Sequence, residues 1–189
     1  MMLRTATMWI VVATGLVVAG QVTAAGSTHS MSSMKGSTAT RNFVKQVAMG
    51  GMAEVEISRL ATTQGTNADV KAFAQRMVDD HSKANDELKA LAQQKNWMLP
   101  AGMDAKHRAA MARLQKLNGA AFDRAYMKSM MADHKQVVAM FQRYSRTGSD
   151  ADLKTWVDKT LPTIESHMSS AMATAREVGA MAKPMATTP

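Results

Sequence analysis

The chain has no cysteine among its 189 residues. This absence excludes disulfides, a thiol nucleophile and a lipid anchor on an N-terminal cysteine. Without disulfides the fold must be stabilised by a packed hydrophobic core, and the chain is long enough to bury one.

Long apolar runs are also lacking, because none reaches the roughly 20 residues that a membrane-spanning helix needs. One shorter run extends from Met8 to about Gly20, follows a single basic residue, Arg4, and leads into Ala24 and Ala25. This order is typical of a secretory signal peptide. We therefore expect a signal peptide over residues 1–25, cleaved after Ala24 or Ala25, no transmembrane segment in the mature chain, and a periplasmic or secreted location.

Clusters of basic residues are missing, although the net charge is +8. Lys and Arg recur singly, with acidic residues between them and no interleaved aromatic residues. Nucleic-acid-binding proteins concentrate such charges, so we expect no nucleic-acid partner. The excess charge is compatible with attraction to an anionic envelope surface, or with a protein partner.

Strand-like alternation is absent, and apolar residues recur every three or four positions, which predicts an all-α fold. The Ser/Thr/Gly-rich residues 26–40 are expected to form a flexible linker, and residues 180–189 a disordered tail. The domain between them, residues 41–179, is predicted to contain five helices, over 42–63, 68–95, 104–117, 120–146 and 150–178. Pro162 is expected to kink the last helix.

The connections between these helices predict their arrangement. Short turns at residues 64–67 and 147–149 favour two antiparallel hairpins, while the segment 104–117 forms a long crossover that returns the next helix parallel to the second. This is the connectivity of a ferritin-like four-helix bundle with a short crossover helix. Residues 65–73 also match residues 148–156, as two hairpins related by a pseudo-twofold axis would, although similar turn chemistry explains part of the match.

Five ionisable side chains fall on or beside the predicted inner faces, namely Glu54, His81, Asp133, His134 and His167. Glu54 lies within roughly 20° of Phe43 on a helical projection. An ionised carboxylate there needs a partner, because burying it alone costs several kcal/mol. Asp-His pairs recur at 80–81 and 133–134, and the projection places Asp133 centrally and His134 at the edge of its apolar face.

Imidazoles and a carboxylate that point inward from four helices predict a site for a transition metal such as Fe, Cu or Zn. The alternative is that each His hydrogen-bonds a neighbouring helix and fills space. Counting from the turns displaces Glu54 from His81, and His134 from His167, by roughly 6–8 Å along the bundle axis. Helix tilt or the Pro162 kink would have to close that gap.

The Glu-x-x-His motif of di-iron ferritins is absent, because Val78, Met131 and Ile164 stand three residues before the histidines. No Ser-His-Asp arrangement or glycine-rich phosphate loop is present either, which disfavours an enzyme. Methionine is abundant, with 19 residues, and its groups suit a copper carrier, namely Met31/Met34 with His29 nearby, Met49/Met52 and Met127/Met130/Met131. Methionine at helical spacing also serves as flexible core filler.

Several segments between residues 42 and 178 carry a family resemblance. They include Gly-Gly-x-Ala-Glu, Asp-His-Ser-Lys, Ala-Tyr-Met, Asp-His and Leu-Pro-x-x-x-x-His. With these motifs the chain resembles the bacterial domain-of-unknown-function 4142 family. The resemblance implies a ferritin-like four-helix fold and an envelope location, and it implies no substrate.

These observations support three hypotheses on function. The first is a non-catalytic envelope- or stress-related binding protein, because no complete catalytic set is present. The second is a metal-binding or metal-dependent redox protein with a His/carboxylate site inside the bundle. The third is a copper carrier rich in Met and His.

Overall fold

The computed structural model describes residues 37–181, which form five helices and no strand. The expected signal peptide, most of the expected linker and residues 182–189 lie outside this range. The helices are α1 (Thr38–Gln64), α2 (Ala68–Lys95), α3 (Ala105–Leu114), α4 (Gly119–Thr147) and α5 (Ala151–Glu177). The predicted all-α fold is therefore confirmed, and α2 has the predicted bounds. None of the described helices is long and apolar enough to cross a membrane.

Both ends of the described domain differ slightly from the prediction. Helix α1 begins four residues before the expected position 42, because the Ser37 side chain accepts a hydrogen bond from the Thr40 backbone N–H and caps the helix. At the other end, the backbone N–H groups of Ala180 and Met181 donate to the Ala175 carbonyl. The first two residues of the expected tail therefore continue the fold.

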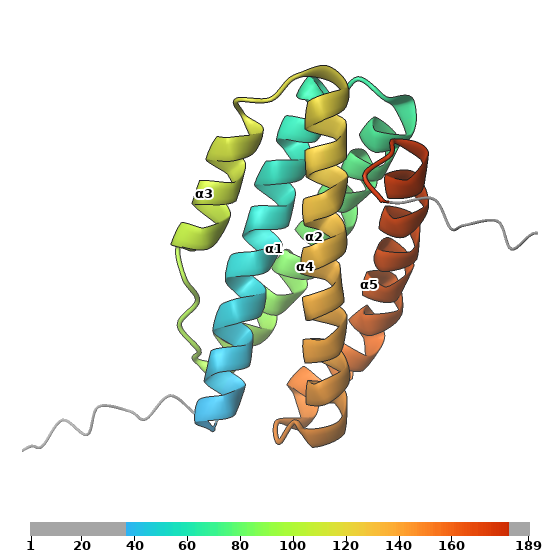
Figure 1. The fold of residues 1–189 in the computed structure, drawn as a ribbon. Helices are drawn as coiled ribbons and strands as arrows, with labels where there is room; N and C mark the ends of the chain where they lie inside the picture. The colour runs from blue at the N-terminus through green and yellow to red at the C-terminus, as the bar shows by residue number, and fades with distance from the viewer. Residues whose placement is uncertain (1–36, 182–189) are drawn as a thin grey trace, which may run out of the picture. The chain divides into compact units, whose positions relative to one another are not determined.

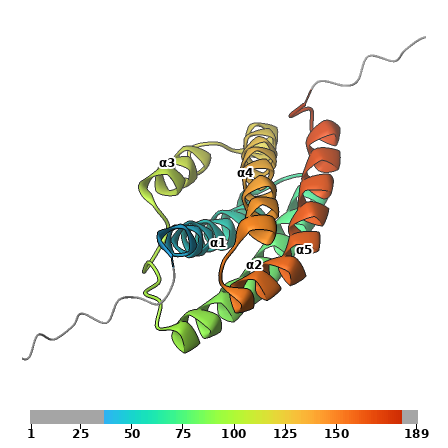
Figure 2. The ribbon, with the colours of Figure 1, turned by 90° about the horizontal axis from the view of Figure 1, so that it is seen from below.

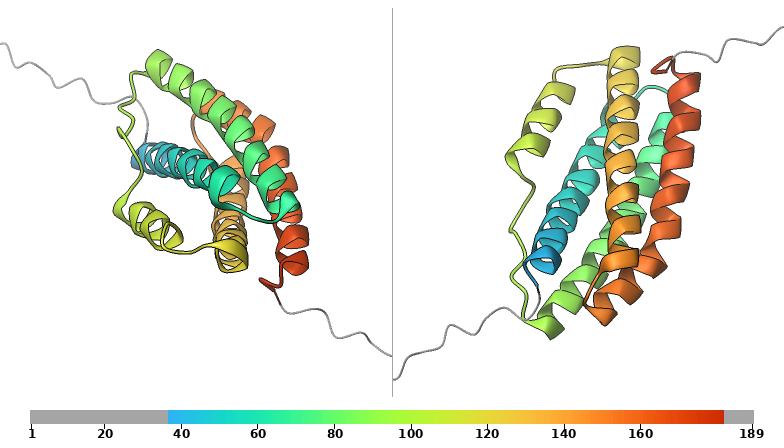
Figure 3. Two further views of the ribbon diagram at one scale, coloured as in Figure 1. Left: turned by 90° about the horizontal axis from the view of Figure 1, so that it is seen from above. Right: turned by 60° about the horizontal axis from the view of Figure 1, so that its bottom comes forward.

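The long helices pack as two antiparallel hairpins, α1 with α2 and α4 with α5 (Figure 1). Helix α1 contacts α2 and α4, and α5 contacts the same two helices, so α2 and α4 lie on a diagonal (Figure 2). Helix α3 lies outside this bundle beside α1 and leads back to the start of α4, which therefore runs parallel to α2 (Figure 3). These are the connections of the predicted ferritin-like bundle.

The two hairpin turns use the same chemistry. The Gly65 N–H donates to the Ala61 carbonyl, and the Gly148 N–H donates to the Tyr144 carbonyl. Asn67 caps α2 and Asp150 caps α5, each through a side-chain oxygen. The repeated sequence thus encodes a repeated turn and cap.

A buried carboxylate joins the first turn to the second hairpin. Asp123 in the first turns of α4 is 2% exposed and accepts hydrogen bonds from the backbone N–H and hydroxyl of Thr66 and from the Asn67 N–H. Hydrogen bonds to a charged acceptor are stronger than neutral ones. The position of α4 is consequently tied to the α1–α2 turn.

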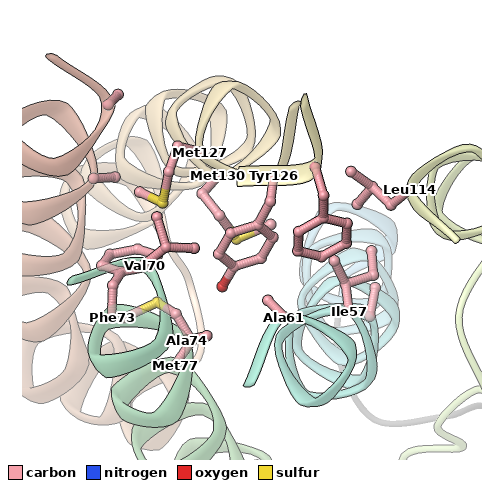
Figure 4. Packing of buried hydrophobic residues seen from close by; sticks show 14 of the residues in the cluster. Ile57, Ala61, Val70, Phe73, Ala74, Met77, Leu114, Tyr126, Met127 and Met130 are labelled. Atoms are coloured by element: carbon pink, nitrogen blue, oxygen red, sulfur yellow. The ribbon is translucent and has the colours of Figure 1, made fainter. Parts of the chain in front are cut away.

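Two separate apolar clusters form the core. The first cluster lies at the α1–α2 turn and contains Ile57, Met77, Tyr126, Met127 and Met130 among its members (Figure 4). Met127 and Met130 are fully buried there, which confirms that these methionines fill the core. The second cluster lies toward the α4–α5 turn and is built around Phe43, Leu88, Phe141, Leu153 and Trp156.

Candidate metal centre

A layer of buried polar side chains separates the two apolar clusters. It contains Glu54, His81, His134 and His167, one from each long helix, with exposed fractions of 8%, 7%, 1% and 1%. Along each of these helices the polar residue stands between a member of the first cluster and a member of the second. On α2, for example, His81 lies between Met77 and Leu88, and on α4 His134 lies between Met130 and Phe141. The polar layer is therefore covered by one apolar cluster on each side along the bundle axis.

The three imidazoles of the layer converge. The ring centroids of His81 and His134 are 5.7 Å apart, those of His81 and His167 5.3 Å, and those of His134 and His167 5.5 Å. One ring nitrogen from each residue lies within 4.8 Å of the other two. The three rings therefore meet, despite the displacement along the bundle axis that the sequence predicts between His134 and His167.

Hydrogen bonds fix which nitrogen of two of these rings carries the proton. The Nδ1 atom of His134 lies 2.9 Å from the Met130 carbonyl oxygen, which can only accept, so Nδ1 carries the hydrogen. The Nε2 atom of His167 lies 2.8 Å from Oδ2 of Asp80 and donates to that carboxylate. In the neutral rings, Nε2 of His134 and Nδ1 of His167 are therefore bare lone pairs.

These two bare nitrogens have no hydrogen-bond partner, and one nitrogen of His81 also lacks one. His81 Nε2, His134 Nε2 and His167 Nδ1 are all buried without one. Leaving a buried polar atom unpaired costs about 1–3 kcal/mol, and native proteins rarely tolerate three of them in one place. Space-filling alone does not explain the layer, since apolar side chains would fill it at lower cost.

Burial keeps the three imidazoles neutral. It lowers the pKa of His134 to about 4, with a further contribution from His167. Burial also holds the pKa of His81 well below its usual value, and the neighbouring His134 and His167 add to this. Burial lowers the pKa of His167 as well, although Asp80 opposes the shift. Neutral imidazole is the form that binds a metal ion.

Glu54 lies beside the imidazoles and is also neutral at physiological pH. Its Oε1 is 4.0 Å from Nδ1 of His134, and its Oε2 has no hydrogen-bond partner. Burial, together with the charge of Asp133, raises the pKa of Glu54 to about 8. Because His134 is neutral too, the contact between them at pH 7 is not an ion pair. Glu54 is near the Nδ1 face of His134, away from its bare Nε2.

The structure places Asp133 and His134 the other way round from the helical projection. His134 is central in the core, whereas the Asp133 side chain is 16% exposed and lies at the edge. Its Oδ1 is 3.5 Å from Nζ of Lys106 on α3, and its Oδ2 accepts from Ser129. The buried face of α4 follows Tyr126, Met130 and His134, which the projection misplaced by one position.

Asp80 also contributes to the site, although the sequence placed it only in an Asp-His motif and not among the candidate metal ligands. It stands one residue before His81 and therefore points about 100° away from it, toward α5, where it meets His167. The signal was present in the Asp-His pair itself. The second pair behaves differently, because Asp133 turns to α3 instead.

The remaining candidates lie apart from this cluster. His107 on α3 contacts Oδ1 of Asp104, its own N-cap residue, through Nδ1 at 2.9 Å. His29, Met31 and Met34 lie outside the described residues. Among the described residues, the only group of three or more His, Cys, Asp or Glu side chains close enough to share an ion is that of the three imidazoles.

The donor set fits a transition metal. Nitrogens bound to one ion at about 2.0 Å are roughly 3.3 Å apart in tetrahedral geometry. The observed limit of 4.8 Å leaves at most about 1.5 Å to be closed on binding an ion. Asp80 and the Met130 carbonyl hold two rings by their other nitrogens, as the supporting groups of metal sites do.

Fold and site together define a ferritin-like helical bundle with a three-histidine layer in its centre. The chain belongs to the family described as Domain of unknown function (DUF4142), whose model matches residues 25–174. The resemblance seen in the sequence is thereby confirmed. No curated protein matches the chain.

Solved structures share this fold at low sequence identity. A DUF305 fragment from Deinococcus radiodurans has a TM-score of 0.66 and 12% identity, covering 77% of this chain and 99% of its own. A DUF305 protein from Streptomyces coelicolor, described as a candidate secreted protein, has a TM-score of 0.64 and 16% identity, covering 78% and 97%. CopM in a Cu(II)-bound form has a TM-score of 0.62 and 16% identity, covering 72% and 95%.

Proposed function

We propose that this protein binds a transition-metal ion through His81, His134 and His167, and that the ion is Cu(II). The observation that carries the proposal is the convergence of three buried imidazoles from three helices, each of which has one nitrogen without a hydrogen-bond partner. We further propose that the protein works in the periplasm or outside the cell, as its N-terminal residues predict. In this proposal the three imidazoles bind the ion, and the carboxyl groups of Glu54 and Asp133 lie nearby without binding it.

The choice of ion follows from the donors. Imidazole suits Cu, Zn, Fe and Ni, and Cu(II) binds most tightly among the divalent ions of the first transition row. The likeness of the fold to CopM, which is described with Cu(II) bound, supports copper. Zn(II) is the competing ion, since it accepts the same ligands in tetrahedral geometry.

The charge of the surroundings favours a cation. The three imidazoles are neutral, while Asp80 and Asp133 bring carboxylates to the edge of the layer. Asp80 contacts His167 directly and so partly compensates the charge that an ion introduces. A neutral, dry interior alone would oppose that charge.

Metal titration of the purified mature protein tests the proposal. We expect one tightly bound Cu(II) per chain, measured by equilibrium dialysis and elemental analysis, and loss of that ion in His81→Gln, His134→Gln and His167→Gln. His107→Gln is the matched control, because His107 lies on α3 outside the cluster. Circular dichroism verifies that each variant is folded.

Other outcomes would select another function. Copper that persists in the three variants but disappears when His29, Met31 and Met34 are replaced indicates the Met/His copper carrier. One equivalent of Zn(II) held more tightly than Cu(II) overturns the choice of copper. Absence of tight binding for Cu, Zn, Fe and Mn leaves the non-catalytic envelope-binding protein.

A further inference from the structure

A cavity of about 300 Å³ opens beside the three-histidine layer. Most of its exposed wall is apolar, from residues such as Val47, Val137, Met140 and Phe141, and the charged side chains of Asp104 and Asp133 line it as well. Lys106 of α3 also lines it and is largely exposed, so the cavity reaches the surface beside α3. Its volume is at the lower end of the range for small-molecule sites.

The inner part of this cavity is polar. Glu54 and His81 line it, and both residues are more than nine-tenths buried. Each carries an unpartnered atom, Oε2 of Glu54 and Nε2 of His81. His81 is the one member of the three-histidine cluster among the residues that line this cavity.

Three protein ligands leave a metal ion with a vacant position. Among the described residues no fourth His, Cys, Asp or Glu joins the cluster. Two nearby carboxylates are engaged elsewhere, Asp80 with His167 and Asp133 with Lys106. Glu54, whose Oε1 is 4.0 Å from Nδ1 of His134, is not among the groups close enough to share the ion. Sites with three protein ligands and one free position are typical of ions that bind an exchangeable ligand, whereas structural sites are closed.

We infer that the metal ion of this site exchanges a small external ligand through the 300 Å³ cavity, a rather apolar molecule with one nitrogen or oxygen donor. The inference rests on the proposed function. The donor lone pair enters the vacant position on the ion next to His81. The apolar walls enclose the rest of the molecule, and Glu54 offers it a hydrogen bond.

A second, smaller cavity of about 100 Å³ lies on the α2/α5 side and is lined by His81 and His167. Its other walls carry the charged side chains of Asp80, Lys83, Glu87 and Lys159. Its size and its charge suit water better than an apolar ligand. In the test, this smaller cavity is the alternative path by which an external ligand could reach the ion.

Gly50 allows the larger cavity to be filled without touching a ligand. It lines the cavity, and a Cβ built at this position meets no atom within 4 Å. Gly50→Leu therefore occupies cavity space, while Gly50→Ala adds one methyl group and controls for the gain in helix propensity. Thr163→Leu fills the smaller cavity from α5 in the same manner.

The test uses Co(II) as the probe metal, since its visible spectrum reports the ligands, and imidazole as the probe ligand. We expect imidazole to shift the spectrum of the Co(II)-loaded wild type while dialysis shows that Co(II) stays bound. Gly50→Leu should raise the half-saturating imidazole concentration by at least about tenfold, as overfilling a pocket does. Gly50→Ala and Thr163→Leu should change it by less than about twofold.

Each contrary result has its own meaning. If neither Cu(II) nor Co(II) is retained, or if either ion is retained after all three His→Gln substitutions, the proposed function fails. If Co(II) is held by the three histidines but imidazole leaves the spectrum unchanged, the exchangeable ligand is disproved and the metal site stands. If Thr163→Leu blocks imidazole and Gly50→Leu does not, the assigned cavity is wrong.

Discussion

Asp80 on α2 accepts a hydrogen bond from Nε2 of His167 on α5, with 2.8 Å between Oδ2 and Nε2. The contact fixes the tautomer of His167 and leaves its buried Nδ1 as a lone pair without a partner. It crosses from the first hairpin to the second. Asp80 thus orients a side chain 87 residues away in the sequence.

Asp80→Asn should weaken Cu(II) binding by about 10–100-fold, because the amide no longer stabilises the orientation and basicity of His167. Asp80 is 38% exposed, so the fold should tolerate the change. Asp79→Asn is the matched control, since Asp79 is exposed and contacts Gln75. Competition titration measures both affinities. Equal affinities in the two variants would mean that the Asp80 contact does not support a metal ligand.

His134→Leu should make the metal-free protein more stable, by about 1 kcal/mol, while abolishing metal binding. The reason is that leucine removes an unpartnered buried nitrogen from between two apolar clusters. Denaturant unfolding with a chelator present measures the change. A clear loss of stability in this variant would indicate that His134 is kept for packing and not for a ligand.

The alkaline side of the stability profile should depend on Glu54. Its pKa is about 8 in the folded protein, above the ordinary value of 4.5, so the folded state holds a proton that the unfolded state releases between these values. Stability from this group is therefore fully present below pH 4.5 and is lost as pH rises to 8, by about 5 kcal/mol at most. Glu54→Gln should abolish this decline in denaturant unfolding of the metal-free protein between pH 6.5 and 9.

On the acid side, stability should change with pH in the opposite direction, because burial lowers the pKa of His134 to about 4. Here the unfolded state binds the proton first, so stability is lost as pH falls from 6.5 toward 4. Between pH 4.5 and 6.5 the gain from His134 opposes the loss from Glu54, and the lowered pKa values of His81 and His167 add to the gain, so the metal-free wild type should be most stable near pH 6.5. A profile that is flat from pH 5 to 9 would contradict the burial of both groups.

Asp123→Asn should destabilise the fold by about 2–3 kcal/mol without changing metal affinity. The amide loses the charge that strengthens the hydrogen bonds from Thr66 and Asn67. Asp69→Asn is the control, because Asp69 is exposed in the first turn of α2. Thermal unfolding compares the two variants. A similar effect of both substitutions would show that Asp123 does not hold the turn.

The sequence predicted the helices well because their signals are local. Asn67 caps α2 and Pro100 and Gly102 follow it, so residues 68–95 could be assigned without knowledge of the neighbours. The connection lengths then decided which helices are antiparallel. Helix α1 was placed too late because Ser37 caps it from within a stretch that resembles a linker.

The site could be predicted only in part, since it depends on distances between helices. The positions of His81 and His134, four residues after Met77 and Met130, indicated a shared level in the bundle. The pairing of Asp80 with His167 was not visible, because it requires the relative rotation of α2 and α5. The central position of His134 was missed for a related reason, as a projection of one helix does not show which neighbours cover it.

The three imidazoles come from both hairpins, His81 from the first and His134 and His167 from the second. A bound ion would thus cross-link the two hairpins of a chain that has no cysteine to form a disulfide. Loading and release of the ion would then set how easily the halves part, and with it the resistance of the protein to proteases in its surroundings.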